Sequence, residues 1–516
     1  MVNNTLNFRP LLRQKKRLFW LAVWCTTAYL LLTELRGYHQ SQSHPADPIS
    51  LAKKEVNSKL KQATKFRSSS SNNNNNNNAH PASGPKSKSI QGEGYCSEKE
   101  YLEGSWVKRQ VPLRDFKEVR EAFGLQDLTE LKCHAVDDAA PRLPPDPEYT
   151  ARVLETAQYE WNTTNGCKKY AFDRMAFAKR CLRAKAGVTF IGDSLTEHTW
   201  HVITGLMVGS DELFWWDGTP DHNFRLMLRK DHPLAIPLLD AARVGHDRAD
   251  TPLASFYRDH HVMSRDEMDA AFAGVQGYLP FKERSEEQLK VKWVFEETKW
   301  WRWWQKKFTT PIGYDLGKLL PQGPVRPEKS VLIFNVGPHW SRGELAADPE
   351  QMSFNAVADG YTKLVAGVLE KLRTLPRNEI LAFWRAVSPG DPECEQYPEP
   401  VNNRTTHFSV NNPLAEQFNW NAYPEMNRHT SSRLSYQPST SSVRLRPSPE
   451  PLRYLDVWPL SVTRPDAHLK PAIDCMHYCI PSAPNEWISF LWHLMVIDAA
   501  NDDYIDQEPI LPIPAT

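Results

Sequence analysis

Short apolar runs that alternate with helical patterns constrain the fold of this chain most strongly. β-Branched and other apolar residues dominate residues 188–191, 291–295, 331–334 and 380–384. Apolar residues recur every three or four positions over 172–185 and over 354–372, the spacing of helices that lie on a core. Strands alternating with helices predict an α/β fold whose mostly parallel sheet is covered on both faces. In such sheets the functional site lies at the carboxyl ends of the strands.

One apolar run near the N-terminus approaches membrane-spanning length. Residues 18–32 are mainly apolar, the run extends to residue 35, and five Lys or Arg residues precede it. The cations predict a cytosolic tail over 1–17 and a single transmembrane signal anchor over 18–35. We therefore expect a single-pass type II protein of the Golgi or ER membrane whose body faces the lumen. A cleaved signal peptide is the alternative, although no small-x-small cleavage site follows the run.

Two polar stretches divide the rest of the chain. Residues 36–94 are rich in Ser, Lys and Asn and hold almost nothing apolar to bury, so we expect a disordered stem. Residues 95–516 then form the folded domain. Within it, a stretch from about residue 395 to about residue 451 is rich in Asn, Ser, Thr and Pro and lacks helix or strand patterning. This composition predicts a low-complexity insertion loop.

The cysteines agree with an oxidising compartment. Cys25 lies in the apolar run, and the other seven predict three disulfides and one free thiol, which we assign to Cys181 because it lies in a helical pattern. Six paired cysteines allow 15 connectivities, and the sequence does not choose among them. Zinc is a weaker alternative, so no metal site is expected. The sequons at Asn162 and Asn403 would carry glycans in a secretory lumen.

Charge balance and missing motifs argue against three classes of protein. The chain has 62 Lys+Arg and 62 Asp+Glu, which argues against a nucleic-acid binder with a broad basic face. A metal-dependent glycosyltransferase would need an Asp-x-Asp at a strand end, and no convincing one is found. The sequence shows no Gly-rich phosphate-binding loop that would support direct nucleotide binding.

Ser194 stands where a nucleophile of an α/β enzyme is expected. It follows the strand predicted over 188–191 on a Gly-Asp turn and precedes a helical pattern. The N-terminus of that helix would direct backbone N–H groups at developing negative charge. A serine that only caps the helix is the alternative. The motif is not the Gly-x-Ser-x-Gly elbow, because residue 196 is Thr.

Two further motifs carry side chains that complete such chemistry. Asp474, three residues before His477, can orient the imidazole and leave its other nitrogen to take the Ser194 proton. Asn335 ends the strand predicted over 331–334 and can donate into an oxyanion hole. The alternatives are an Asp and a His that each hydrogen-bond to other partners in a disulfide-rich loop, and an Asn that only shapes a turn before Gly337.

In chain order, these pieces resemble the GDSL/SGNH family of esterases and acyltransferases, and most closely its PC-esterase branch, the plant trichome birefringence-like and fungal Cas1-type proteins. The blocks that carry the resemblance are GVTFIGDSLTEHTW, SVLIFNVGPHW, FWRAVSPG and DCMHYCIPSAPNEW. YCSEKEYLEGSWV and YEWNTTNGC resemble its cysteine-bearing N-terminal blocks more weakly. The resemblance spans about residues 95 to 500. This chain departs from the pattern at Ala386, where the family has Thr, and at Pro338, which interrupts the Asn block.

The resemblance implies a three-layer α/β/α domain in a Golgi-facing enzyme that moves acetyl groups onto polysaccharide hydroxyls through an acyl-serine intermediate. It implies Ser194 as nucleophile, His477 as general base and acid, and Asp474 as its orienter. Asn335 and the Ser194 N–H would be the oxyanion donors. Acetyl-CoA is the simplest acetyl donor, with no cofactor bound, and a multi-spanning transporter would have to supply it.

Three more side chains are candidates for substrate contact, and two other functions stay open. Trp300 and Trp301 could stack on sugar rings, and Arg385 could position a donor or acceptor oxygen, although core packing and a structural ion pair explain them equally well. The same triad would serve a carbohydrate acetyl esterase if water reached the acyl-enzyme. A non-enzymatic wall-glycan binding protein is the other reading.

Overall fold

The computed structural model describes residues 94–126, 131, 133, 147–218, 223–285, 299–309, 328–402, 417–471 and 473–500. The predicted cytosolic tail and anchor, nearly all of the predicted stem, the strand predicted over 291–295 and the sequon at Asn403 lie outside these residues. Among the described helices, none combines the length and the apolar character needed to cross a bilayer.

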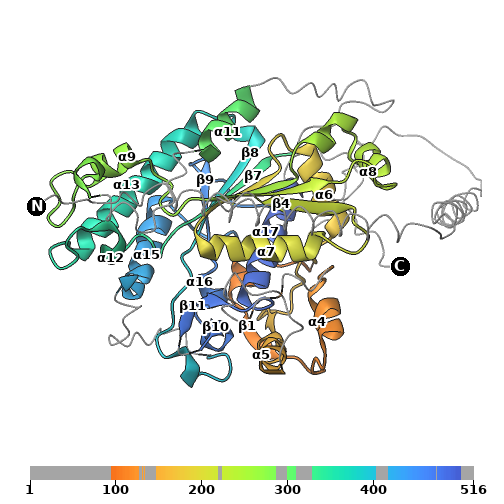
Figure 1. Ribbon diagram of the computed structural model, residues 1–516. Helices are drawn as coiled ribbons and strands as arrows, with labels where there is room; N and C mark the ends of the chain where they lie inside the picture. The colour runs from red at the N-terminus through yellow and green to blue at the C-terminus, as the bar shows by residue number, and fades with distance from the viewer. Residues whose placement is uncertain are drawn as a thin grey trace, which may run out of the picture. The chain divides into compact units, whose positions relative to one another are not determined.

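A mostly parallel sheet organises the described residues (Figure 1). It has seven strands in the order β4-β5-β6-β3-β7-β8-β9. β6, β3, β7, β8 and β9 run parallel to one another, and β5 pairs antiparallel with β4 and β6 at one edge. The strands are β3 (Val188–Gly192), β4 (Phe214–Gly218), β5 (Phe224–Leu228), β6 (Ala254–Arg258), β7 (Ser330–Asn335), β8 (Ile380–Arg385) and β9 (Leu452–Leu455). The predicted α/β class is confirmed.

Helices cover both faces of this sheet. On one face α7 packs against β3 and α17, while α11 and α13 lie on the opposite face (Figure 1). Trp300 of α11 meets Phe334 of β7 edge-on, and Trp384 of β8 stacks on the same Phe334. The helices are α3 (Glu98–Leu102), α4 (Phe116–Phe123), α5 (Pro147–Ala157), α6 (Arg174–Arg183), α7 (Ser194–Met207), α8 (Ala235–Ala242), α9 (Arg265–Ala271), α11 (Lys299–Thr309), α12 (Arg342–Leu345), α13 (Phe354–Arg373), α15 (Tyr423–Arg433), α16 (Trp458–Ser461) and α17 (Ala483–Ala500).

Two small two-stranded sheets lie outside the main sheet. β1 (Ser105–Lys108) pairs antiparallel with β2 (Tyr159–Asn162), and β10 (His468–Lys470) pairs antiparallel with β11 (Asp474–Tyr478). Disulfides fasten both: Cys96–Cys167 flanks the first, while Cys133–Cys479 and Cys394–Cys475 hold the second. Cys181 is free and buried, as predicted, and burial raises the pKa of its thiol to about 12.

The predicted elements that fall on described residues match the structure, with one correction. The runs at 188–191, 331–334 and 380–384 form β3, β7 and β8, and the patterns at 172–185 and 354–372 form α6 and α13. The expectation of a loop without helix patterning over 395–451 is wrong for Tyr423–Arg433, which is α15. Tyr423, Met426 and Thr430 of this helix are buried, and α15 packs against α13. The helix was not predicted because most of its residues are polar, and the few buried residues at helical spacing form only a short stripe.

Candidate active site

Ser194 occupies the first turn of α7, directly after the central strand β3. Parallel neighbours β6 and β7 hold β3 on both sides, so the strand end is fixed by the sheet. Gly192 is required by close approach: a Cβ there would lie 1.9 Å from the backbone oxygen of Asn335. That oxygen also accepts a hydrogen bond from Thr196 Oγ1 at 3.0 Å. The tight β3–α7 turn therefore depends on a residue without a side chain.

The N-terminal cap of α7 is Asp193, not Ser194. The Asp193 carboxylate is fully buried and accepts hydrogen bonds from the backbone N–H groups of Leu195 at 3.0 Å and Gly337 at 3.2 Å. It thus joins the β3–α7 turn to the loop after β7. Ser194 itself is only partly buried. The capping role that was the alternative for Ser194 is filled by its neighbour, which leaves the hydroxyl available.

His477 reaches Ser194 from the β10–β11 hairpin. Its Nε2 lies 2.7 Å from Ser194 Oγ, and its Nδ1 lies 2.8 Å from Asp474 Oδ2. The side chains of His477 and Asp474 are 25% and 22% exposed, so the pair is open on one side. The structure therefore brings Ser194, His477 and Asp474 together in hydrogen-bond contact, although 283 residues separate the serine from the histidine.

Local backbone geometry holds Asp474 beside His477. Asp474 Oδ1 accepts hydrogen bonds from the N–H groups of Met476 at 3.1 Å and His477 at 3.0 Å, a turn that Asp forms readily. Burial acts to raise the pKa of this carboxyl, but the hydrogen bonds and charge of His477 outweigh it and hold the pKa of Asp474 well below its usual range. An ionised Asp474 accepts the Nδ1–H of His477, which leaves Nε2 free to accept the hydroxyl proton of Ser194.

Asn335 does not have the geometry predicted for an oxyanion donor. Its side chain is 0% exposed, and its Nδ2 donates to the backbone oxygens of Arg385 and Ala386, both at 3.2 Å. Its Oδ1 accepts a hydrogen bond from Arg385 Nη2, which fixes the orientation of the amide. With both N–H groups used inside the protein, Asn335 ties β7 to β8 and has no donor left for a substrate.

Arg385 is likewise an internal residue, so its predicted contact with substrate is not supported. Its side chain is 1% exposed, and its guanidinium lies over the ring of Trp487 at 4.4 Å. Burial lowers its pKa to about 10, which still leaves it charged at neutral pH. Arg385 acts within the core as the partner of Asn335. The alternative of a structural role is supported, although the hydrogen-bond partner is the neutral amide of Asn335.

The two tryptophans predicted to bind sugar lie on α11, across the sheet from α7 (Figure 1). Trp300 is 0% exposed and packs on Phe334, which excludes it from sugar contact and confirms its core alternative. Trp301 is partly buried beside Trp300. The side-by-side tryptophans of this helix mainly cover the sheet.

Several polar residues near the strand ends escaped sequence reasoning. Asp259, His260 and His261 follow β6, a strand that was not predicted because its run of five residues is short and polar at its end. His260 stacks on His339, from the loop after β7, at 3.8 Å between ring centroids. The ring of His198, on α7, lies 5.2 Å from that of His477. The His-His pair after an apolar run was the signal that could have found this histidine-rich edge.

The described residues hold little that could bind a metal. Cys394, Glu395 and Cys475 are the only group there with clustered ligand atoms, but the two cysteines form a disulfide and cannot act as thiolate ligands. Of the two sequons, Asn162 is exposed at the end of β2, where a glycan could be attached.

Comparison with known families finds a similarity in the C-terminal part of the chain. Residues 326–494 match the PC-Esterase model, described as a GDSL/SGNH-like acyl-esterase family found in Pmr5 and Cas1p. The match includes Asn335, Asp474 and His477, whereas Ser194 lies before it. A search of the curated proteins found no match.

Proposed function

We propose, from the match of residues 326–494 to the PC-esterase family and from the contacts of Ser194, that this protein is an acyltransferase. It would move an acetyl group through an acyl-Ser194 intermediate onto hydroxyls of a polysaccharide or glycan. One observation carries the proposal: the unbroken hydrogen-bond chain from Ser194 Oγ through His477 to Asp474. This is the geometry of an activated serine nucleophile.

In the first half-reaction, Ser194 Oγ attacks the acetyl carbonyl carbon while its proton moves to His477 Nε2. The carboxylate of Asp474 stabilises the imidazolium that forms and keeps Nδ1 protonated. The tetrahedral intermediate then collapses, the bond to the donor's sulfur or oxygen breaks, and the leaving group takes the proton from His477. Acetyl-Ser194 remains.

In the second half-reaction, an acceptor hydroxyl occupies the place that the leaving group has left. His477 Nε2 takes the hydroxyl proton, the acceptor oxygen attacks the acyl carbon, and the bond to Ser194 Oγ breaks. The proton returns to Ser194, so the enzyme ends each cycle unchanged.

Negative charge on the carbonyl oxygen needs donors, and α7 supplies them in this proposal. Ser194 is the first residue of a 14-residue helix, where a backbone N–H has no acceptor within the helix. The positive end of the helix dipole points the same way. Because Asn335 is committed to β8, we propose the Ser194 N–H as the oxyanion donor and not Asn335.

The surroundings of Ser194 suit a polar acceptor. Glu197, one turn further along α7, lies 3.7 Å from Arg258 at the end of β6, and both side chains are partly exposed. Such groups can exchange hydrogen bonds with sugar hydroxyls. The partial exposure of His477 also admits water, so hydrolysis of acetyl esters by the same side chains is the second candidate function.

The setting of the reaction is also a proposal. Three disulfides favour an oxidising compartment, in agreement with a Golgi or ER membrane enzyme with a luminal catalytic domain, an N-terminal anchor and a glycan on Asn162. Acetyl-CoA would be the acetyl donor, supplied across the membrane by a multi-spanning transporter. A nucleic-acid partner is not proposed.

Partitioning of the acetyl group tests this function. The full chain is incubated with acetyl-CoA or p-nitrophenyl acetate, with and without a panel of oligosaccharides, and both acetylated sugar and free acetate are quantified. We expect acetylated sugar from the wild type and none from Ser194→Ala. Ser353→Ala is the matched control, because Ser353 caps α13 through a 3.1 Å hydrogen bond and has no proposed role in catalysis.

The other outcomes decide among the alternatives. Release of acetate with every acceptor would make the protein an esterase. A folded wild type with three disulfides that releases neither product but retains oligosaccharides would make it a glycan-binding protein.

A further inference from the structure

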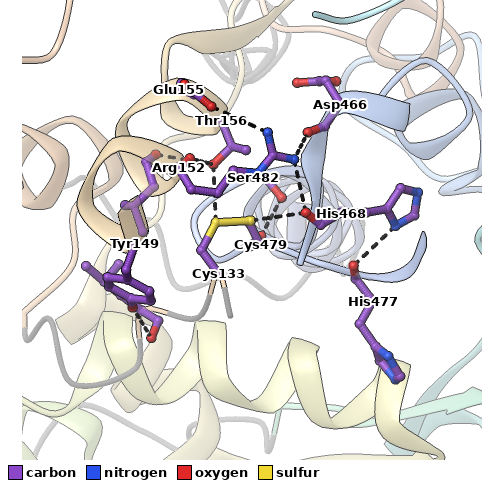
Figure 2. The surroundings of a disulfide bond; sticks show 12 residues. Cys133, Tyr149, Arg152, Glu155, Thr156, Asp466, His468, His477, Cys479 and Ser482 are labelled. Carbon is purple, nitrogen blue, oxygen red and sulfur yellow. Dashed lines mark hydrogen bonds and ion pairs between the residues drawn. A yellow bond between two sulfur atoms is a disulfide. The ribbon is translucent and has the colours of Figure 1, made fainter. Parts of the chain in front are cut away.

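A second histidine–carboxylate pair includes a residue on the other strand of the hairpin that carries His477. His468 opens β10, is fully buried, and its Nε2 lies 2.7 Å from Asp391 Oδ2. Its Nδ1 lies 3.2 Å from the backbone oxygen of His477 (Figure 2). We propose that His468, held by Asp391, is a positioning residue that sets the alignment of His477 with Ser194. This inference rests on the proposed role of His477 as the base.

The partners of His468 fix where its protons are. A backbone carbonyl only accepts hydrogen bonds, so the Nδ1 that faces His477 O must carry a hydrogen. Nε2 faces Oδ2 of Asp391. One proton lies in the hydrogen bond between this nitrogen and this oxygen, whichever of the two atoms carries it. The ring therefore presents a donor to the His477 backbone, and the His477 carbonyl disfavours the other neutral tautomer, whose bare Nδ1 would face that oxygen.

The hairpin itself supplies a reason for this extra donor. His468 is opposite Tyr478 and Lys470 is opposite Asp474, so two residue steps on β10 face four on β11. The irregular pairing falls on the stretch that includes His477. A strand in regular register is held by its ladder, whereas here the imidazole of His468 supports the His477 carbonyl from the side.

Asp391 connects this support to the main sheet. It follows β8, and its backbone N–H donates to the oxygen of Cys475 at 2.9 Å. The disulfide from Cys394 to Cys475 joins the same two segments. On the other side, Arg152 of α5 donates through Nη2 to the oxygen of His468 at 3.1 Å (Figure 2). His468 is thus held through its ring by Asp391 and through its backbone by Arg152, and it can transmit that position to His477.

The expected consequence is a loss of alignment, not of the fold. Without the His468 donor, the His477 backbone can shift, and its Nε2 moves away from Ser194 Oγ. Misplacement of a reacting group by about 1 Å costs on the order of a hundredfold in rate. Binding of a substrate over Ser194 would change much less, because His468 is buried behind β11 and does not face it.

Two substitutions of His468 separate positioning from simple burial. The amide of Asn reaches the place of Nδ1, and the amide of Gln reaches the place of Nε2. His468→Asn therefore keeps a donor for His477 O but loses Asp391, whereas His468→Gln keeps Asp391 but loses the donor. The full chain is treated with a fluorophosphonate probe, and labelling of Ser194 is followed by mass spectrometry. We expect labelling to slow more than tenfold in His468→Gln and less than about threefold in His468→Asn.

His493→Gln is the matched control. His493, on α17, is also fully buried, accepts the N–H of Tyr170 at 3.1 Å and contacts Cys96 O at 2.8 Å, but neither partner belongs to the proposed site. It should lose stability without slowing the labelling of folded protein. Equal rates in His468→Asn and His468→Gln, or a wild-type rate in both, would overturn the proposal.

A second readout keeps the test independent of activity. In protein labelled with ¹⁵N-histidine, the His477 ring signals should shift in His468→Gln and stay near their wild-type positions in His468→Asn. If the wild type does not label with the probe, the proposed function fails, and the spectra still decide the positioning role. Unchanged His477 signals in His468→Gln would contradict that role.

Discussion

The two halves of the site are held in place by different means. Ser194 stands at the junction of a central parallel strand and a long buried helix, with sheet neighbours on both sides. His477 stands on a two-stranded hairpin of irregular register that is fastened by two disulfides and by buried side chains. The nucleophile is thus positioned by the core, and the base by cross-links. Damage to the core should lower stability, whereas damage to the cross-links on the base side should also disturb the alignment of His477.

The largest effect expected on the base side comes from Asp474→Asn. An amide can donate to Nδ1, which favours the tautomer that cannot accept the Ser194 proton at Nε2. We expect fluorophosphonate labelling of Ser194 to fall by about 10³- to 10⁴-fold with little change in melting temperature. Glu393→Gln, an exposed change in the neighbouring loop, should label at the wild-type rate. A fall of less than tenfold in Asp474→Asn would mean that His477 needs no carboxylate.

Removal of two different disulfides tests the comparison directly. Cys394–Cys475 and Cys96–Cys167 close segments of 81 and 71 residues, so each stabilises the fold by a similar amount, about 4 kcal/mol on chain-entropy grounds. Replacing both cysteines of either disulfide by Ser should therefore lower the free energy of unfolding by a similar amount in the two variants. Only loss of the Cys394–Cys475 bridge, next to Asp474, should also slow Ser194 labelling of the folded protein, by tenfold or more. Equal labelling rates would show that cross-links do not align the base.

On the nucleophile side, Gly192→Ala should damage the fold. The new Cβ would lie 1.9 Å from Asn335 O and 2.3 Å from Thr196 Oγ1, so β3 and β7 must move apart. We expect a loss of about 1–3 kcal/mol in the free energy of unfolding, measured by urea denaturation. Gly367→Ala, in α13 with no atom within 4 Å of its Cβ, should instead gain about 0.5–1 kcal/mol. A stable Gly192→Ala protein would contradict the tight turn.

A further effect, on stability alone, concerns a region that lies in neither half. Burial raises the pKa of Glu98, which accepts hydrogen bonds from Ser439 N and Tyr436 Oη, from 4.5 to about 7. Because the folded state holds this proton more tightly, its contribution to stability is full below pH 4.5 and is lost as the pH rises through 7. The loss is about 3 kcal/mol at most.

Glu98→Gln should remove this change in the free energy of unfolding between pH 4.5 and 7, measured by denaturation at several pH values. The pH dependence of Ser194 labelling should stay unchanged. An unaltered slope would show that Glu98 is not the titrating group. A changed labelling profile would show that the two regions are coupled.

The two halves also differ in how far the sequence predicts them. The apolar run, the Gly-Asp dipeptide and the helical pattern after it predict β3, the turn and α7, because each depends on neighbouring residues. The three-residue spacing predicts Asp474 beside His477, since both lie on one short segment. Only the order of the motifs indicates which serine contacts that histidine. The set of three disulfides, which includes the bridge from Cys133 to Cys479 across 346 residues, is one of 15 connectivities that composition does not rank.

The misassigned residues share a physical reason. Asn335 and Arg385 each end a strand, at the edge of the sheet formed by the carboxyl ends of the parallel strands. A substrate is expected to bind at that edge. The sequence does not show that these two side chains point at each other, which satisfies both inside the core. Polar residues at strand ends can therefore serve either the site or the sheet, and only burial and partners distinguish the two.

The central claim is that Ser194, aligned by His477, is the nucleophile. Rapid quenching of the full chain with p-nitrophenyl acetate, followed by peptide mapping in a mass spectrometer, tests it most directly. The account predicts one acetyl group on the peptide that contains Ser194 in the wild type, much slower labelling in His477→Gln, and none at that position in Ser194→Ala. A folded wild type with its three disulfides intact that carries acetyl elsewhere, or nowhere, would contradict it.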